Sequence, residues 1–446
     1  MAEKKTNKNN SKKKTSGTKT TSKKTSTSKQ PLEKTIKKNV KKTVKKTVKK
    51  NPWIIIVLVI VAVVTLGTLT ALVLTGVIPN PIKVLNQETT SQITDSGSGS
   101  SDSGSSGSDS GNSGNTTVST VEFEGTVYDD FQVHFLELGN WYTGDSIYIK
   151  AGDNDILIDA GSKYDSADDI ESYINQYVTD NKLEYVIATH AHEDHISGFS
   201  GGSSKNGILY HYDIGTIIEF AKTNSNSGVY NNYVAARNYA VEHGAKCYTA
   251  LQAYNDTSLR TIPLGTDMSM TTLYQKYYEQ EASTENDYSV CTLFTYKEHH
   301  FLFTGDLESG GESSLVDSNT LPQCELYKAG HHGSKTSSSN KLMAVVQPKV
   351  VCVCCCCGSD EYTKTNANQF PTQDFVNRVA PYTSNVYVTS ISVDNETKTK
   401  ASMNGYINFS SNGTQYSVAC SNNQTVLKDT EWFKTNRTTP NEWITA

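Results

Sequence analysis

Four potential metal ligands, His190, His192, Asp194 and His195, lie within six consecutive positions of the segment THAHEDH at 189–195. They follow the apolar run YVIA at 185–188, which predicts a short buried strand. The first two histidines would project to the same side of an extended segment, whereas Asp194 and His195 must diverge unless the backbone turns. Imidazole nitrogens and carboxylate oxygens are ligands for zinc, manganese and iron. The order H-x-H-x-D-H therefore predicts a metal centre rather than a polar surface loop, and the divergence suits two ions side by side.

Further strand-like and ligand-bearing segments flank this motif. They are VHFLELGN (133–140), GDSIYIKAG (144–152) and DILIDAGS (155–162) upstream, and HFLFTGDLE (300–308) and ELYKAGHHGSKTSSS (325–339) downstream. Together with THAHEDH, they resemble the metallo-β-lactamase-fold hydrolases over roughly residues 130–420. The GHHGS element with its serine-rich tail most resembles the hydrolase domain of ComEC-type DNA-uptake (competence) proteins and related phosphodiesterases. The resemblance implies an α/β fold, the αββα sandwich of that family, and is specific for the fold but not for the substrate.

The resemblance also implies a centre for two divalent ions, zinc or manganese. Its ligands would be His190, His192, Asp194, His195, Asp306, His331 and His332. The first two histidines and a third group would hold one ion. Asp194, His195 and one of the two later histidines would hold the other, and Asp306 would bridge both. A hydroxide held between two ions is a nucleophile at neutral pH, and the ions stabilise charge on a phosphoryl or carbonyl oxygen, so Asp194 and Asp306 are expected to be essential for catalysis.

Three other residues are candidates for supporting roles at the centre. Asp159, in LIDAG, would fix the ligand-bearing loop by hydrogen bonds instead of touching metal. Ser334 and Lys335 follow the histidine pair and either contact a phosphate of the substrate or are plain loop residues.

The third ligand of the first ion has no matching histidine. Between Gly198 and Asp306 the chain offers only His211, His243, His299 and His300, none in the expected context. The segment NDYS at 286–289 resembles what ComEC-like domains carry at this point, so Asp287, Asn286 or water would complete the first site. The number of bound ions is therefore open, and weak metal binding at that site favours manganese or a mixed centre over zinc alone.

Apolar periodicity predicts alternating strands and helices in this part of the chain. Strands are expected at 132–138, 146–149, 156–158, 287–296 and 300–304, helices at 166–178 and 230–243, and a tight glycine turn at 196–202. Residues 385–418 read as β-rich, with hairpin turns at Asn404-Gly405 and Asn412-Gly413. This alternation is typical of α/β layering.

The N-terminal part has a different composition. Residues 1–50 contain 19 lysines and carry a net charge of about +17, with too few apolar side chains to fold alone. Residues 1–52 are predicted to be a disordered cytoplasmic arm, whose basic KKxV tract would lie on an anionic membrane surface, remain solvated or bind nucleic acid.

Residues 53–78 lack charged side chains and would span roughly 39 Å as a helix, which predicts an uncleaved signal anchor rather than a cleaved signal peptide. Residues 79–120 form a Ser/Gly/Asp linker to a domain at 121–446, which the positive-inside rule places outside the cell on a single-pass anchor.

Five of the nine cysteines fall in VVCVCCCCG at 350–358. Consecutive residues of a strand face opposite ways, so these thiols are unsuited to gather around one ion and are expected to fill both faces of a buried strand.

Net charge bears on the substrate. The chain has a charge of −5, so residues 51–446 carry about −22. Tight binding of a polyanion relies on lysine and arginine, and only a local patch of Lys328, Lys335, Lys341 and Lys349 would offset the negative field.

The leading hypothesis is a membrane-anchored extracellular phosphodiesterase, with nucleic acid as the first substrate to test and no obligate protein partner. The alternatives are hydrolysis of smaller phosphodiesters, such as phosphocholine-bearing polymers or lipid headgroups, and a surface binding module without turnover.

Overall fold

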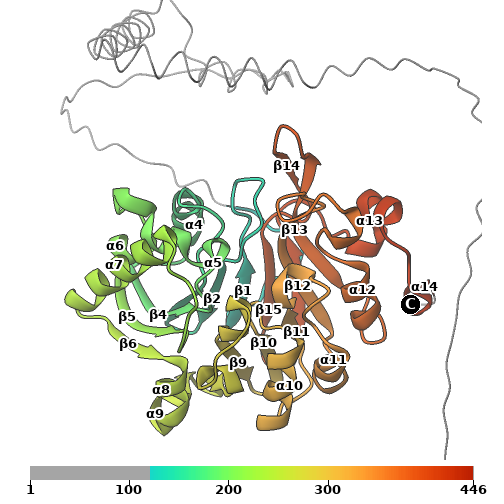
Figure 1. Cartoon of the computed structure of the whole chain (residues 1–446). Helices are drawn as coiled ribbons and strands as arrows, with labels where there is room; N and C mark the ends of the chain where they lie inside the picture. Colours follow the sequence, from blue (N-terminus) through green and yellow to red (C-terminus); the bar gives the residue numbers. More distant parts are fainter. Residues whose placement is uncertain (1–120, 445–446) are drawn as a thin grey trace, which may run out of the picture. The chain divides into compact units, whose positions relative to one another are not determined.

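The computed structural model of the chain describes residues 121–444, and the arm, anchor and linker predicted for residues 1–120 lie outside them. Two eight-stranded sheets pack face to face, and helices cover the outer face of each sheet (Figure 1). This arrangement is the αββα sandwich expected from the sequence. Among residues 121–444, no helix is long and apolar enough to cross a membrane.

The first sheet has the order β16-β15-β1-β2-β3-β4-β5-β6. Its strands are β1 (Phe131–Phe135), β2 (Ile147–Ala151), β3 (Asn154–Ile158), β4 (Lys182–Ala188), β5 (Asp213–Glu219), β6 (Lys246–Thr249), β15 (Ile407–Ser411) and β16 (Tyr416–Cys420). Strands β3 to β6 are parallel, because a helical segment follows each of β3, β4 and β5 and returns the chain to the same edge. The helices of this half are α4 (Ser166–Ile174), α5 (Glu193–Ser200), α6 (Ile208–His211), α7 (Gly228–Glu242), α8 (Ala250–Asn255) and α9 (Thr257–Arg260).

The second sheet has the order β14-β13-β12-β11-β10-β9-β8-β7. Its strands are β7 (Thr261–Gly265), β8 (Met268–Leu273), β9 (Cys291–Tyr296), β10 (His299–Phe303), β11 (Leu326–Lys328), β12 (Val350–Cys357), β13 (Val386–Asp394) and β14 (Thr399–Ser402). Strands β10 to β13 are parallel to one another. The helices of this half are α10 (Ser309–Ser318), α11 (Asn340–Val346), α12 (Gln373–Val379), α13 (Glu431–Asn436) and α14 (Asn441–Ile444).

Aromatic side chains join the two sheets. The ring of Phe131 on β1 stacks on that of Phe301 on β10, with centroids 4.7 Å apart, and Phe301 also meets Phe409 on β15 at 5.4 Å. Such pairs add to the burial of apolar area that drives sheet packing. The two sheets are therefore held at a fixed separation, which sets the distance between loops that leave their edges.

Several predicted elements have different bounds. The strand expected from residue 287 begins at Cys291, because Glu285–Tyr288 forms a 3-10 turn. The glycine turn expected at 196–202 is wrong for its first part, since α5 continues to Ser200 and the left-handed residues are Gly201 and Gly202 at its end. Asn412-Gly413 joins β15 to β16 as expected, but Asn404-Gly405 is not a hairpin turn. It lies where the chain passes from the second sheet to the first, and the hairpin of this region is β13–β14.

The cysteine-rich strand β12 is buried along its whole length. Cys352 and Cys354 face the core between the sheets, whereas Cys355 and Cys357 face the core under the outer helices. The expectation that these thiols fill both faces of a central strand is confirmed.

Candidate metal centre

The metal-binding motifs converge where parallel strands of both sheets end. THAHEDH follows β4, Asp306 follows β10 and GHHGS follows β11. The carboxyl ends of parallel strands meet at one edge of a sheet, and the face-to-face packing of the sheets brings the two edges together. Residues more than 100 positions apart in the chain therefore share one centre.

Four side chains form the densest cluster. Ligand atoms of Asp194, His195, Asp306 and His332 all lie within 4.8 Å of one another. The Oδ2 atom of Asp306 is 3.2 Å from His195 Nε2 and 3.3 Å from His332 Nε2. These two ring nitrogens are buried and make no aligned hydrogen bond with any residue of the described part. Two imidazoles and two carboxylates aimed at one point fit a divalent ion.

His190 and His192 form a separate pair beside this cluster. Their Nε2 and Nδ1 atoms are 3.0 Å apart, so both rings face the same point, as the extended spacing predicts. The side chains of Asp194 and His195 do not diverge. The backbone turns into α5 at Glu193, directly after His192, and both side chains then reach the four-residue cluster. Burial and the neighbouring His195 and His192 lower the pKa of His190 well below its ordinary value, which keeps this ring neutral. A neutral imidazole is the form that binds metal.

Asp159 holds the ligand loop as predicted. Its carboxylate accepts hydrogen bonds from the backbone N–H of Thr189 at 2.8 Å and from the Thr189 hydroxyl at 2.7 Å, and contacts His195 Nδ1 at 2.8 Å. Gly161 of the same DAGS motif packs so closely that a Cβ there would collide with the carbonyl oxygen of Asp194. The DAGS loop thus fixes the orientation of His195 and the start of α5.

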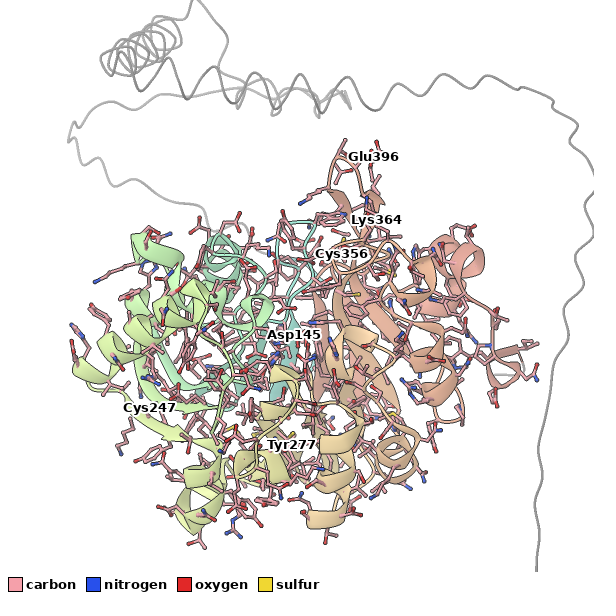
Figure 2. All side chains as sticks on the ribbon, in the orientation of Figure 1. Asp145, Cys247, Tyr277, Cys356, Lys364 and Glu396 are labelled. Carbon is pink, nitrogen blue, oxygen red and sulfur yellow. The ribbon has the colours of Figure 1, made fainter. Side chains whose placement is uncertain are left out.

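Asp145, which is labelled near the middle of the domain in Figure 2, forms a buried ion pair with Lys328 behind the centre, and the sequence did not reveal this pair. The Lys328 ammonium also lies 3.4 Å from Asp306 Oδ1, and Asp145 lies 3.2 Å from His332 Nδ1. Lys328 therefore does not share a patch with the other three lysines, because it is buried to 1% exposure at the end of β11. Lys341 and Lys349 pair with Asp317 and Glu325 instead of forming that patch.

Opposite charges stabilise each other inside this cluster. Burial alone would raise the pKa of Asp306, but the positive charges of His332, His195 and Lys328 lower it well below its usual range. Conversely, burial would lower the pKa of His195, yet the carboxylates of Asp306, Asp159 and Asp194 raise it well above its ordinary value. Without metal the cluster is therefore a network of imidazolium and carboxylate groups, and an entering cation would replace protons on the histidines.

The two consecutive histidines of GHHGS take different places. Both have positive φ, 49° at His331 and 53° at His332, a region that costs non-glycine residues of order 1 kcal/mol. This conformation sends His332 into the cluster, where its Nδ1 faces the carbonyl of Cys354 at 2.8 Å. His331 lies on the cleft wall, with its Nε2 3.9 Å from Asp306 Oδ2.

The candidates for a third ligand of the His190–His192 pair lie on the 3-10 turn before β9. Asp287 accepts a hydrogen bond from the backbone N–H of Glu308 at 3.2 Å, so its carboxylate is engaged there. Burial raises the pKa of Asp287 to about 6. The amide of Asn286 donates to Glu308 Oε1 at 3.1 Å, and its buried Oδ1 has no partner among the described residues. Only Oδ1 of Asp287 is engaged in this way, so Asn286 and Asp287 each keep one side-chain oxygen without a hydrogen-bond partner among the described residues.

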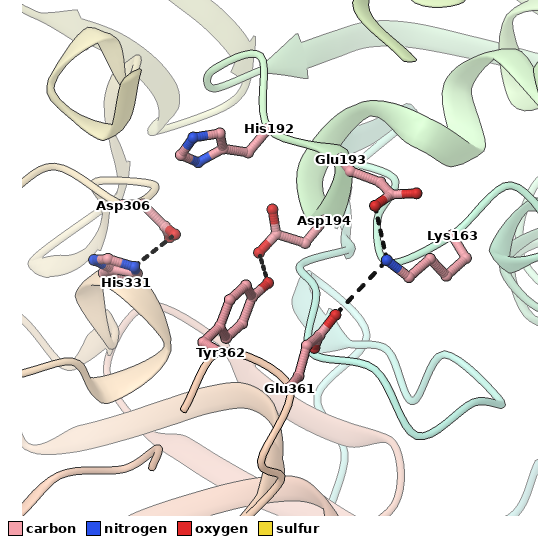
Figure 3. Close-up of a pocket in the computed structure, with 8 residues that line it drawn as sticks. All are labelled: Lys163, His192, Glu193, Asp194, Asp306, His331, Glu361 and Tyr362. Carbon is pink, nitrogen blue, oxygen red and sulfur yellow. Dashed lines mark hydrogen bonds and ion pairs between the residues drawn. The ribbon is translucent and has the colours of Figure 1, made fainter. Parts of the chain in front are cut away.

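A cleft of about 380 Å³ opens onto the centre (Figure 3). Its lining residues are Lys163, His192, Glu193, Asp194, Asp306, His331, Glu361 and Tyr362. The Tyr362 hydroxyl donates to Asp194 Oδ2 at 2.6 Å, and Lys163 pairs with Glu193 at 2.8 Å and Glu361 at 3.7 Å. The sequence did not reveal Lys163, Glu361 and Tyr362, because no spacing links them to the histidines.

Ser334 and Lys335 do not line this cleft. The Ser334 hydroxyl lies 3.1 Å from Thr336 Oγ1, and the Lys335 ammonium donates to Asn368 Oδ1 at 2.9 Å. Their geometry agrees with the alternative that they are plain loop residues.

Comparisons with known proteins found similarity over part of the chain. The family model described as the metallo-beta-lactamase superfamily matches residues 139–213. Recombination protein 2 of Haemophilus influenzae is 31% identical over 108 residues, which are 24% of this chain and 13% of that protein. The chain therefore matches only about an eighth of that relative's length, and the match agrees with the resemblance to ComEC-type proteins.

Among solved structures, this chain is similar to the metallo-beta-lactamase fold protein YhfI from Bacillus subtilis. The two are 13% identical, the match covers 58% of this chain and 96% of that chain, and the TM-score is 0.33. A diphosphatase from the PhnP family has 11% identity, coverage of 50% and 85%, and a TM-score of 0.29.

Proposed function

We propose that this chain, a metal-dependent hydrolase of the metallo-β-lactamase superfamily, acts on phosphodiesters. The observation that carries the proposal is the convergence of Asp194, His195, Asp306 and His332 at the floor of an open cleft. The match to Recombination protein 2 and the GHHGS element favour a phosphodiester over other esters.

The chain's own residues provide a preorganised site. Asp159 and Thr189 orient His195, and the Lys328–Asp145 pair holds the far side of Asp306 and His332. Divalent ions held by the cluster and by the His190–His192 pair would supply an activated water and stabilise charge on a phosphoryl oxygen. Preorganised charge of this kind avoids the cost of reorientation during the reaction. Asp306 has the central role, because its Oδ2 lies within reach of both cluster histidines.

We also propose that the domain acts outside the cell on a single-pass membrane anchor. The support is the uncharged stretch at 53–78 behind a lysine-rich arm, both outside the described residues. Protease added to intact cells should release a fragment that begins within residues 79–120. Removal of the lysine arm alone would contradict this orientation.

The catalytic test uses the purified chain loaded with zinc or manganese. It should hydrolyse at least one of bis-p-nitrophenyl phosphate, single-stranded DNA and RNA, and Asp306→Ala should reduce the rate to background. Asp153→Ala, on the exposed turn between β2 and β3, is the matched control and should retain activity. A wild-type chain that binds metal yet hydrolyses none of these substrates would favour a surface binding module.

A further inference from the structure

Tyr362 is unusual among the aromatic residues of the described domain. It remains 55% exposed, whereas the large tyrosines of the core, such as Tyr233 and Tyr327, are fully buried. The exposed ring lies in the cleft, with its hydroxyl directed at Asp194 (Figure 3). An exposed aromatic face inside a cleft beside the metal centre is a surface on which a ligand can pack.

The loop that carries Tyr362 is anchored on both sides of the ring. Glu361 accepts a hydrogen bond from the backbone N–H of Thr143 at 2.9 Å, which ties the loop to the opposite sheet. Further along, the Arg437 guanidinium donates to the carbonyl oxygens of Gln369 at 2.7 Å and Pro371 at 2.8 Å. The backbone around Tyr362 is therefore fixed while its side chain faces solvent, as expected of a preformed binding surface.

Aromatic rings continue from Tyr362 toward the centre. Its ring centroid lies 5.7 Å from that of Phe370, and Phe370 lies 5.6 Å from His331 and 5.8 Å from His332. Phe370 supports one side of the tyrosine, and a planar ligand group would occupy the exposed side. Such a group would then lie within the same cleft as Asp306, where the phosphate of the proposed substrate must bind.

Charge in the cleft argues against recognition through the phosphate backbone. Lys163 is the single cation among the lining residues, and two glutamates already neutralise it. A quaternary ammonium headgroup is also disfavoured, because such cations are bound by cages of several aromatic rings and here one exposed ring stands near a lysine. A planar base stacked on Tyr362 requires neither feature.

We infer that Tyr362 is a base-stacking residue of this cleft, which selects phosphodiesters that carry a nucleobase next to the scissile phosphate. This inference rests on the proposed function for its substrate class. The hydroxyl contact with Asp194 sets the tilt of the ring, and the ring face provides the selectivity. Tyr362 is thus a specificity-determining residue.

Equilibrium binding to the manganese-loaded full chain tests this inference without turnover. The probes are AMP and ribose 5-phosphate, which differ only in the base. The wild-type chain should bind AMP about ten-fold or more tightly than ribose 5-phosphate, in the range that one base–aromatic stack provides. Tyr362→Leu should abolish this preference, and Tyr362→Phe should retain it.

Tyr239→Leu is the matched control, because this ring lies on α7 against His243 and does not line the cleft. It should leave the AMP preference unchanged, and circular dichroism and metal content should be the same in all variants. Equal binding of the two probes, binding of neither, a preference that survives in Tyr362→Leu, or tighter binding of phosphocholine than of AMP would overturn the inference. A preference for AMP in a chain that hydrolyses no phosphodiester would contradict the proposed function but not the role of Tyr362. Hydrolysis of bis-p-nitrophenyl phosphate without a preference for AMP would contradict the role of Tyr362 but not the proposed function.

Discussion

His331 and His332 are adjacent in the chain but face different parts of the cleft. His332 is fully buried in the ligand cluster, with its Nε2 3.5 Å from Asp194 and 3.3 Å from Asp306, whereas His331 lines the wall. We expect His332→Ala to lose bound metal, because it removes one of the four clustered donors. His331→Ala should retain metal and lower turnover through weaker substrate contact. Elemental analysis of the two purified variants checks this, and equal metal loss in both would contradict it.

Lys328 illustrates how a single buried cation supports several carboxylates. It contacts Asp145 and Asp306, and these groups raise its pKa above the ordinary value although burial opposes that shift. Lys328→Met would leave two buried carboxylates without this partner, and we expect the free energy of unfolding of the metal-free chain to fall by about 3–5 kcal/mol.

Lys341→Met is the control for this prediction, since Lys341 and Asp317 are 42% and 65% exposed and pair at 2.6 Å. Loss of an exposed pair should cost no more than about 1 kcal/mol. Urea denaturation of both variants measures the difference. Similar losses in the two would show that the buried pair contributes little.

At the scale of elements, α10 holds the serine-rich loop that follows GHHGS. Glu312 on α10 is fully buried and accepts hydrogen bonds from the backbone N–H groups of Ser338 and Ser339, the latter at 2.7 Å. Burial raises the pKa of Glu312 from 4.5 to about 7. Ionisation of this carboxyl group therefore makes the stability of the fold depend on pH.

The sign of the pH effect follows from that raised pKa. Between pH 4.5 and 7 the folded chain retains a proton that the unfolded chain releases, so stability falls as pH rises through this window. The Glu312 contribution should decrease by on the order of 3 kcal/mol from pH 4.5 to pH 8. Glu312→Gln, which cannot ionise, should lack this part of the decrease in urea denaturation of the metal-free chain. Glu242→Gln, on an exposed part of α7, should behave as wild type. Parallel pH curves for wild type and Glu312→Gln would refute the assignment.

At the scale of the whole molecule, charge is divided unevenly. Residues 1–50 carry about +17 and residues 51–446 about −22, and the cleft lysine is already paired. Any strong affinity for a nucleic acid backbone should therefore come from the arm. Contacts to 6–10 phosphates make affinity fall about 10³–10⁵-fold between 50 and 200 mM salt.

We expect the full chain to show a steep salt dependence for a single-stranded oligonucleotide. A variant that lacks residues 1–50 should lose less than about three-fold in affinity over the same salt range. Fluorescence anisotropy of a labelled oligonucleotide measures both. A steep slope that persists without the arm would place a phosphate-binding surface on the folded domain.

The sequence by itself predicted the candidate ligand residues and the strand ends that carry them. The H-x-H-x-D-H order, Asp306 after a strand and the supporting role of Asp159 are local features, because ligand spacing and strand ends are read along the chain. The buried cysteine strand was equally predictable, since five thiols within an apolar run leave few alternatives.

Tertiary structure alone decided which groups complete the site. Asp145 lies in the loop before β2 of the first sheet, Lys328 ends β11 of the second sheet, and Tyr362 is 168 positions from Asp194, so no periodicity connects them. The choice between His331 and His332 depends on two left-handed backbone conformations, and the role of Asn404-Gly405 depends on which sheet each flanking strand joins. Burial of Lys328 likewise follows from the packing of two sheets rather than from its neighbours in the chain. Contacts between distant segments are set by packing, which local sequence patterns do not encode.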